Sequence, residues 1–93
     1  MIRYVNKTGG AIRSVDIVDR PEHIQIYIQL NDAAALKPTE DALTKIGFTM
    51  LSKATVNGEP MLVASGPRVE SQLIKDLADI AGPLHIQSVK QPF

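Results

Sequence analysis

The segment from His23 to Leu30, HIQIYIQL, constrains the fold of this 93-residue chain more than any other segment. Every second residue in it is aliphatic, and the residues between them are polar or amphipathic. A period of two is typical of a β-strand with one face packed in a core. The alternation therefore predicts a strand that buries Ile24, Ile26, Ile28 and Leu30 and turns Gln25, Tyr27 and Gln29 toward the opposite face.

Residues 1–21 predict an N-terminal β-hairpin. A short apolar run, 2–5, is followed by Asn6-Lys7-Thr8-Gly9-Gly10, whose residues favour a turn. The second arm, 11–18, ends before Pro21, which cannot donate a ladder hydrogen bond. A short connection then leads to the HIQIYIQL strand, so we expect the second arm to be its antiparallel neighbour.

After that strand the hydrophobic period becomes that of a helix. Proline is favourable at the first helical position, so we expect the helix to begin near Lys37 or Pro38. Glu40 and Asp41 would then lie in the first turn, where carboxylates complement the helix dipole. Gly47 provides the C-terminal stop.

Two further strands, 48–56 and 59–65, are predicted on either side of Asn57-Gly58, the strongest two-residue hairpin signal. A two-residue loop sets the register, pairing Ala54 with Met61, Ser52 with Val63, Lys53 with Leu62 and Leu51 with Ala64. Neither face of this hairpin is cleanly polar. We therefore expect both faces to be covered, by the helices and the N-terminal hairpin or by a partner chain.

A second helix is predicted from Pro67, and Gly82-Pro83 ends it. Its core-facing stripe comprises Val69, Leu73, Leu77, Ile80 and Ala81. A last strand, 84–89, follows, and residues 90–93 form a tail that we expect to fray.

From residue 22 to residue 89 the order of elements is strand, helix, strand, strand, helix, strand, which resembles the ferredoxin-like arrangement. The resemblance implies an antiparallel sheet with two helices on one face. We therefore predict a single α+β domain over 1–93, in which the 1–21 hairpin precedes a ferredoxin-like βαββαβ core, 22–89, and the tail.

Composition excludes several classes of function. Ten basic residues balance ten acidic ones, so no net field draws the chain to nucleic acid or anionic membrane. The absence of cysteine excludes disulfides, thiolate catalysis and cysteine-ligated metals. No segment approaches the roughly 18 apolar residues of a membrane span, and the N-terminus lacks the apolar region of a signal peptide. We expect a cytoplasmic protein that does not enter membranes.

No constellation of residues predicts catalysis, a cofactor or a metal. The first and last strands of a ferredoxin-like unit are antiparallel, so His23 and His85 would begin at opposite ends of the sheet and cannot share a metal ion. The serines lie in no recognisable nucleophile context. The expectation is a protein that is not an enzyme.

A weak anion site is predicted where Ser65-Gly66-Pro67-Arg68 leads into the second helix. Free amides and the dipole at a helix start favour an anion, and Gly66 and Arg68 would lie beside it. The alternative is that Arg68 is a solvent-facing charge, and Pro67 removes one amide donor.

Nucleic-acid binding would suit the order of elements, because RNA-recognition domains share it. In such domains the third strand carries a basic residue, glycine and stacking aromatics, whereas residues 59–65, EPMLVAS, have none of these. Tyr27 is the one residue of the neighbouring strand that could stack on a base. These residues argue against nucleic acid as the partner.

The sequence therefore favours a non-enzymatic interaction or assembly module that works through a sheet face or edge, on its own copy or on another protein. Gln25, Tyr27 and Gln29 are the candidate contact residues, with Tyr27 as anchor. The alternatives are that the N-terminal hairpin folds over this face, or that Tyr27 is an ordinary exposed strand residue. Two other functions stay open: a small-ligand regulatory domain, which resembles the ACT-like use of this superfold, and a single-stranded nucleic-acid-binding domain.

Overall fold

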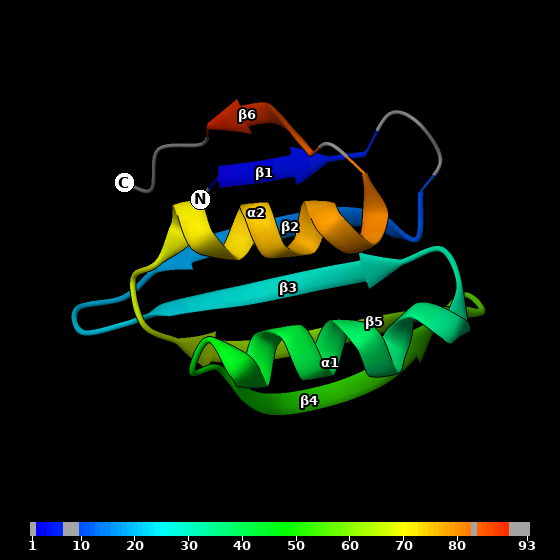
Figure 1. Ribbon diagram of the computed structural model, residues 1–93, viewed down its shortest axis with the longest axis horizontal. Helices are drawn as coiled ribbons and strands as arrows, with labels where there is room; N and C mark the ends of the chain where they lie inside the picture. The colour runs from blue at the N-terminus through cyan, green and yellow to red at the C-terminus, as the bar shows by residue number, and fades with distance from the viewer. Residues whose placement is uncertain (1, 7–9, 83, 90–93) are drawn as a thin grey trace.

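The computed structural model describes residues 2–6, 10–82 and 84–89, with the backbone alone for 85–89. These residues form one six-stranded sheet in the order β4-β5-β3-β2-β1-β6, with every neighbouring pair antiparallel. Both helices lie on the same face of the sheet (Figure 1). The strands are β1 (Ile2–Val5), β2 (Ile12–Asp19), β3 (Ile24–Leu30), β4 (Thr49–Val56), β5 (Glu59–Gly66) and β6 (His85–Val89).

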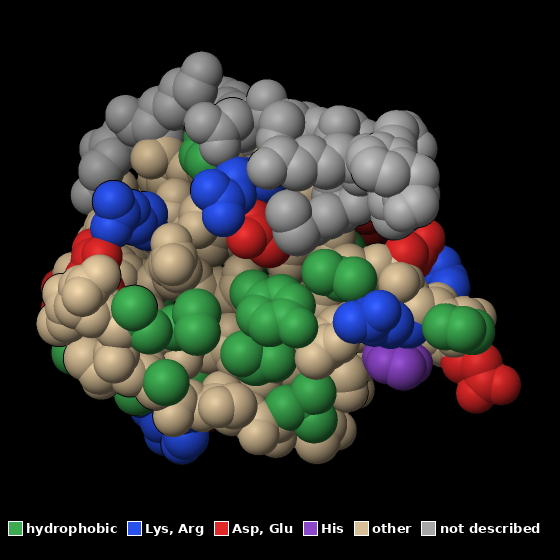
Figure 2. All heavy atoms as spheres, turned by 180° about the vertical axis from the view of Figure 1, so that it is seen from behind, with side chains coloured by type: hydrophobic (Ala, Val, Ile, Leu, Met, Phe, Trp, Pro, Cys, Tyr) green, Lys and Arg blue, Asp and Glu red, His purple; other side chains and the backbone are tan. Residues whose placement is uncertain are grey.

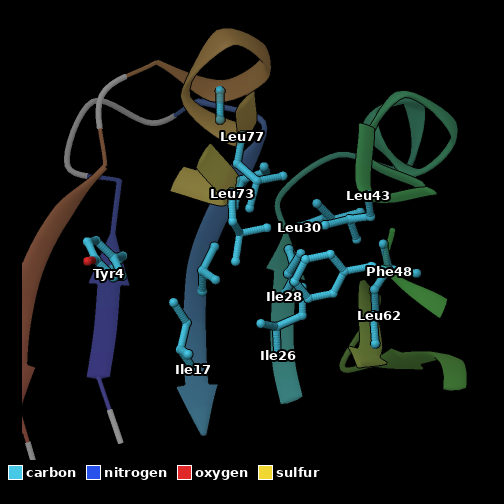
Figure 3. Packing of buried hydrophobic residues seen from close by; sticks show 14 of the residues in the cluster. Tyr4, Ile17, Ile26, Ile28, Leu30, Leu43, Phe48, Leu62, Leu73 and Leu77 are labelled. Atoms are coloured by element: carbon cyan, nitrogen blue, oxygen red, sulfur yellow. The ribbon is translucent and has the colours of Figure 1, made fainter. Parts of the chain in front are cut away.

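The alternation in β3 determines which face of the sheet is the core. Its four aliphatic side chains are buried and its three intervening side chains are half-buried, as the period of two predicts. Figure 3 shows Ile26 and Ile28 of β3 beneath Leu43, Leu73 and Leu77, which the helices supply. The buried apolar core consists of Tyr4, Ile12, Val15, Ile17, Ile24, Ile26, Ile28, Leu30, Ala35, Leu43, Phe48, Leu62, Ala64, Leu73, Leu77 and Ala81.

The first helix begins slightly earlier than predicted. A 3₁₀ turn, Ala33–Ala35, is capped by the Asp32 side chain, which accepts a hydrogen bond from the Ala34 N–H at 2.9 Å. It continues directly into α1 (Leu36–Lys45). Glu40 and Asp41 therefore lie beyond the first turn, so the prediction that they complement the N-terminal dipole is wrong.

The second helix begins later than predicted. Residues 67–69 form a tight turn in which the Val69 N–H donates to the Pro67 carbonyl at 2.8 Å. The helix α2 (Glu70–Ala81) follows this turn. Three residues of the predicted stripe, Leu73, Leu77 and Ala81, are buried against the sheet. The other two, Val69 and Ile80, are half-buried, and Val69 precedes the helix. The predicted tail, 90–93, lies outside the described residues.

The β4–β5 hairpin is confirmed with one change of register. Asn57 and Gly58 both have positive φ, 53° and 81°, as a two-residue hairpin of type I′ requires. Three of the four predicted cross-strand pairs are present, but Ala64 faces Met50 and not Leu51. Leu51 is an extra residue in a β-bulge, which shifts the register of the start of β4 by one residue.

The α+β class, the antiparallel sheet and the helices on one face agree with prediction, but the sheet differs from the ferredoxin-like order in one respect. In that order the strands 23–30 and 84–89 would be neighbours, whereas β2 and β1 lie between them. The physical reason is that a strand has two edges, and those of β3 pair with β2 and β5. The N-terminal hairpin is thus an inner part of the sheet.

Candidate functional site

The face of the sheet that points away from the helices is the candidate site, and we call it the open face. No described helix or hairpin lies over it (Figures 1 and 2). In particular, β1 and β2 continue the plane of the sheet, so the alternative in which the N-terminal hairpin folds over Tyr27 is wrong. The predicted residues Gln25, Tyr27 and Gln29 all lie on this face and are half-buried.

The ladder registers arrange the open face in rows that run across the strands. The central row is Arg3, Asp16, Tyr27, Val63 and Ser52. The row nearer the β4–β5 turn is Val5, Ser14, Gln29, Met61 and Ala54. Tyr27 therefore has Val63 directly opposite and Met61 diagonally adjacent, and these three form an apolar centre in the middle of a polar face. Figure 2 shows hydrophobic side chains gathered in the middle of this side of the molecule.

Ion pairs hold the polar side chains around the apolar centre. Arg3 donates from Nε and Nη2 to the two carboxylate oxygens of Asp16, at 2.7 and 2.8 Å. The bidentate hydrogen bonds, with the carboxylate charge, raise the pKa of Arg3. Arg13 of β2 donates to Glu59 of β5, so its side chain passes across the intervening strand β3.

One end of the open face is hollowed. The hollow has a volume of about 470 Å³, and we call it the arginine hollow because Arg3 and Arg13 both line it, with Ser14, Gln29, Asn57 and Glu59. In a flat sheet, β1 and β4 would be four strand spacings apart, roughly 19 Å. Residues from both strands line the same hollow, so it extends across the strands between β1 and β4.

The hollow was not predicted from the sequence. Its charged residues come from positions 3, 13 and 59, which folding alone brings together. The one signal was local: Arg13 and Ser14 are consecutive polar residues in an otherwise alternating strand. The ladder has a β-bulge there, since Ile12 pairs with Leu30 and Ser14 with Gln29, leaving Arg13 without a partner residue on β3.

The predicted anion site around Gly66 and Arg68 has other contacts. Arg68 donates to the Asp19 carboxylate at 2.6 Å and to the Arg20 carbonyl. A Cβ on Gly66 would stand 2.5 Å from the ring of Phe48, so this glycine is needed for core packing. Because α2 begins at Glu70, neither residue belongs to its first turn. These contacts give both residues structural roles and lend no support to an anion there.

The histidines also lie apart. The ladder places the start of β6 beside Val5 and the start of β3 beside Asp19, so His85 and His23 belong to opposite ends of the sheet. Among the described residues, no three His, Asp or Glu side chains are grouped to hold a metal ion. Within the same residues, no helix is long and apolar enough to cross a membrane.

Comparisons with protein-family models, with curated proteins and with solved structures found no match for this chain.

Proposed function

We propose that this chain is a protein–protein interaction module that associates with a second copy of itself through the open face. The observation that carries the proposal is a sheet face with an apolar centre that no described element covers. Tyr27, Met61 and Val63 lie side by side on adjacent strands. The Arg3–Asp16 ion pair lies on the β1–β2 side of them, and the Arg13–Glu59 ion pair lies at one end of the face. Protein interfaces have this organisation, an apolar core within a polar rim, and tyrosine is a frequent anchor.

The size of the face suits a dimer. The molecule measures 33 × 25 × 25 Å, and Figure 1 views it down the shortest of these axes, so the open face fits within an outline of 33 by 25 Å. A stable interface buries roughly 800 Å² on each partner. A contact over nearly the whole outline would reach that area. Two sheets packed face to face lie about 10 Å apart, close enough for the two apolar centres to interdigitate.

Charge favours a second copy over a partner of opposite charge. Each carboxylate in the rim already pairs with an arginine of the same chain. The chain has equal numbers of acidic and basic residues, so two copies do not repel each other at long range. These two ion pairs carry no net charge, so they do not require a strongly charged partner.

The edge strand β4 is a second candidate surface for the same function. Leu51 is 53% exposed and Val56 43% exposed, and they are the two large apolar side chains described as exposed. The outer edge of β4 pairs with no described strand. An unpaired edge can accept a strand from another chain by β-augmentation.

Analytical ultracentrifugation of three variants tests the proposal. Tyr27→Ala combined with Gln25→Lys should weaken self-association at least about tenfold, because it removes the anchor and buries a charge. Gln72→Lys, the matched insertion of a lysine on the exposed side of α2, should leave association unchanged. Leu51→Lys reports on the edge of β4.

The outcomes separate the surfaces. Dissociation of the Tyr27 variant alone supports the open face, whereas dissociation of the Leu51 variant alone identifies the edge and refutes the proposal. A parent protein that sediments as a monomer up to hundreds of micromolar also refutes it. Unchanged far-UV circular dichroism establishes that each variant is folded.

A further inference from the structure

The arginine hollow has features that self-association does not explain. Its volume of about 470 Å³ lies within the range of small-molecule sites, roughly 300–1,000 Å³. Two arginines line it, together with the amide side chains of Gln29 and Asn57. A hollow that presents guanidinium and amide donors suits a small, acceptor-rich ligand.

The bulge in β2 builds one wall of the hollow. In a regular strand, consecutive side chains point to opposite faces. The extra residue at Arg13 breaks this alternation, so that Ser14 pairs with Gln29 on the open face while Val15 is buried in the core. Arg13 and Ser14 therefore both line the hollow. Bulges that re-aim side chains in this way are over-represented beside functional sites.

Each arginine is held in place and keeps donors for a ligand. A guanidinium carries five N–H donors, and Asp16 accepts two from Arg3. Asp16 is 16% exposed, does not line the hollow, and so orients Arg3 without occupying the space. Glu59 accepts one hydrogen bond from Arg13 and does line the hollow. The lining thus presents two cations and one carboxylate.

We propose that the arginine hollow binds a small molecule that carries a carboxylate or phosphate group, and that Arg3 and Arg13 donate hydrogen bonds to that group. Arginine recognises both groups by paired N–H···O hydrogen bonds, which is the chemistry that the two oxyanions share. Ser14 is 5% exposed, and its hydroxyl donates to the Gln29 amide oxygen at 3.3 Å, which turns the Gln29 NH₂ group toward other acceptors. Glu59 competes with the ligand for Arg13.

The competition gives the proposal a signature of two opposite effects. Arg13→Gln removes one of the two arginines that contact the oxyanion, so it should weaken binding by about tenfold, the effect of losing a charge-assisted hydrogen bond. Removing the competing carboxylate should do the reverse, so Glu59→Gln should strengthen binding several-fold. Arg13→Lys keeps the positive charge but lacks the planar guanidinium group, so its affinity should lie between those of Arg13→Gln and the parent.

The test is a titration of ¹⁵N-labelled protein with inorganic phosphate and, separately, with succinate, at constant ionic strength set with sodium chloride. Shifts at the backbone amides of Arg13, Ser14 and Gln29 report on the hollow, and the stronger of the two probes identifies the class of oxyanion. Arg68→Gln is the matched control, because it removes an exposed, ion-paired arginine outside the hollow. It should bind like the parent.

Three results would overturn the proposal. The first is no saturable chemical-shift change with either probe, the second is an equal loss of affinity in Arg13→Gln and Arg68→Gln, and the third is weaker binding by Glu59→Gln than by the parent. Sedimentation of the same samples measures self-association separately. A monomeric protein that binds phosphate or succinate would refute the proposed dimer and support the proposed site in the hollow. A dimeric protein that binds neither probe would support the dimer and refute the site.

Discussion

The two faces of the sheet are stabilised by different interactions. On the helical face, side chains such as Ile28, Leu62 and Leu73 are completely buried. Each contributes about 1.5–3 kcal/mol through removal of apolar area from water. On the open face, the principal contacts are ion pairs with exposed partners, such as Arg3, which is 41% exposed. Contacts of that kind contribute about 0–1 kcal/mol. The fold therefore depends mainly on the helical face.

The largest difference between core and exposed positions is expected for a leucine-to-alanine substitution made once in the core and once on the exposed edge strand. Leu73→Ala should lower the free energy of unfolding by about 2–5 kcal/mol, because it leaves a cavity between α2 and the sheet. Leu51→Ala, at the exposed bulge of β4, should lower it by less than about 1 kcal/mol. Urea denaturation measures both. Equal losses would mean that β4 is as well packed as the core, contrary to its exposure.

The helical face was the more predictable of the two. Strict alternation in β3 and the stripe of α2 identify the buried residues, because burial of one face requires a matching period. The Asn57-Gly58 turn was equally clear, since both positions need positive φ. These signals are local. Each can be read within about ten residues, and the structure agrees with each.

The order of the strands was less predictable because it depends on competition between distant segments. The short connection between β2 and β3 correctly predicted their pairing. That pairing, with β5 on the other edge, leaves no edge of β3 for β6. The ferredoxin-like order and the β2–β3 pair are thus mutually exclusive. Counting the available edges of β3 would have placed β6 elsewhere.

The open face was predictable in part. The period of β3 predicts that Gln25, Tyr27 and Gln29 lie on it. The apolar residues on both sides of β4 and β5 predict that both faces are covered, but within this chain most of β4 is exposed, because it is an edge strand. The predicted cover by a partner chain stays a prediction. The arginine hollow depends on a bulge and on an ion pair between Arg13 and Glu59, 46 residues apart in the sequence. No short motif encodes that contact.

A polar contact on the helical face should have a larger effect than those on the open face. The Tyr4 hydroxyl donates to Glu70 at 2.6 Å, joining β1 to α2. Burial, and then this hydrogen bond and the charge of Glu70, raise the pKa of Tyr4 to about 12. The ordinary pKa of tyrosine is about 10, so folding favours the neutral phenol. Its contribution to stability is complete below pH 10 and is lost as the pH rises toward 12.

We therefore expect the free energy of unfolding to fall by about 1 kcal/mol between pH 9 and pH 11 because of Tyr4. Tyr4→Phe is the control, since it has no hydroxyl to titrate and should lack this part of the pH dependence. Denaturation of both proteins at a series of pH values measures the difference. Parallel curves would show that the Tyr4–Glu70 contact does not couple to folding.

The smallest effect should come from the best-formed ion pair on the open face. A double-mutant cycle with Arg3→Gln and Asp16→Asn should give a coupling energy of about 0.2–1 kcal/mol, since Arg3 remains hydrated while it binds Asp16. The coupling should decrease in 0.5 M sodium chloride, because salt screens exposed charges. A coupling above about 2 kcal/mol that is insensitive to salt would indicate that the open face contributes to the fold as the helical face does. In that case the orientation of Arg3 would serve stability first, and the case for a ligand in the arginine hollow would depend on Arg13 alone.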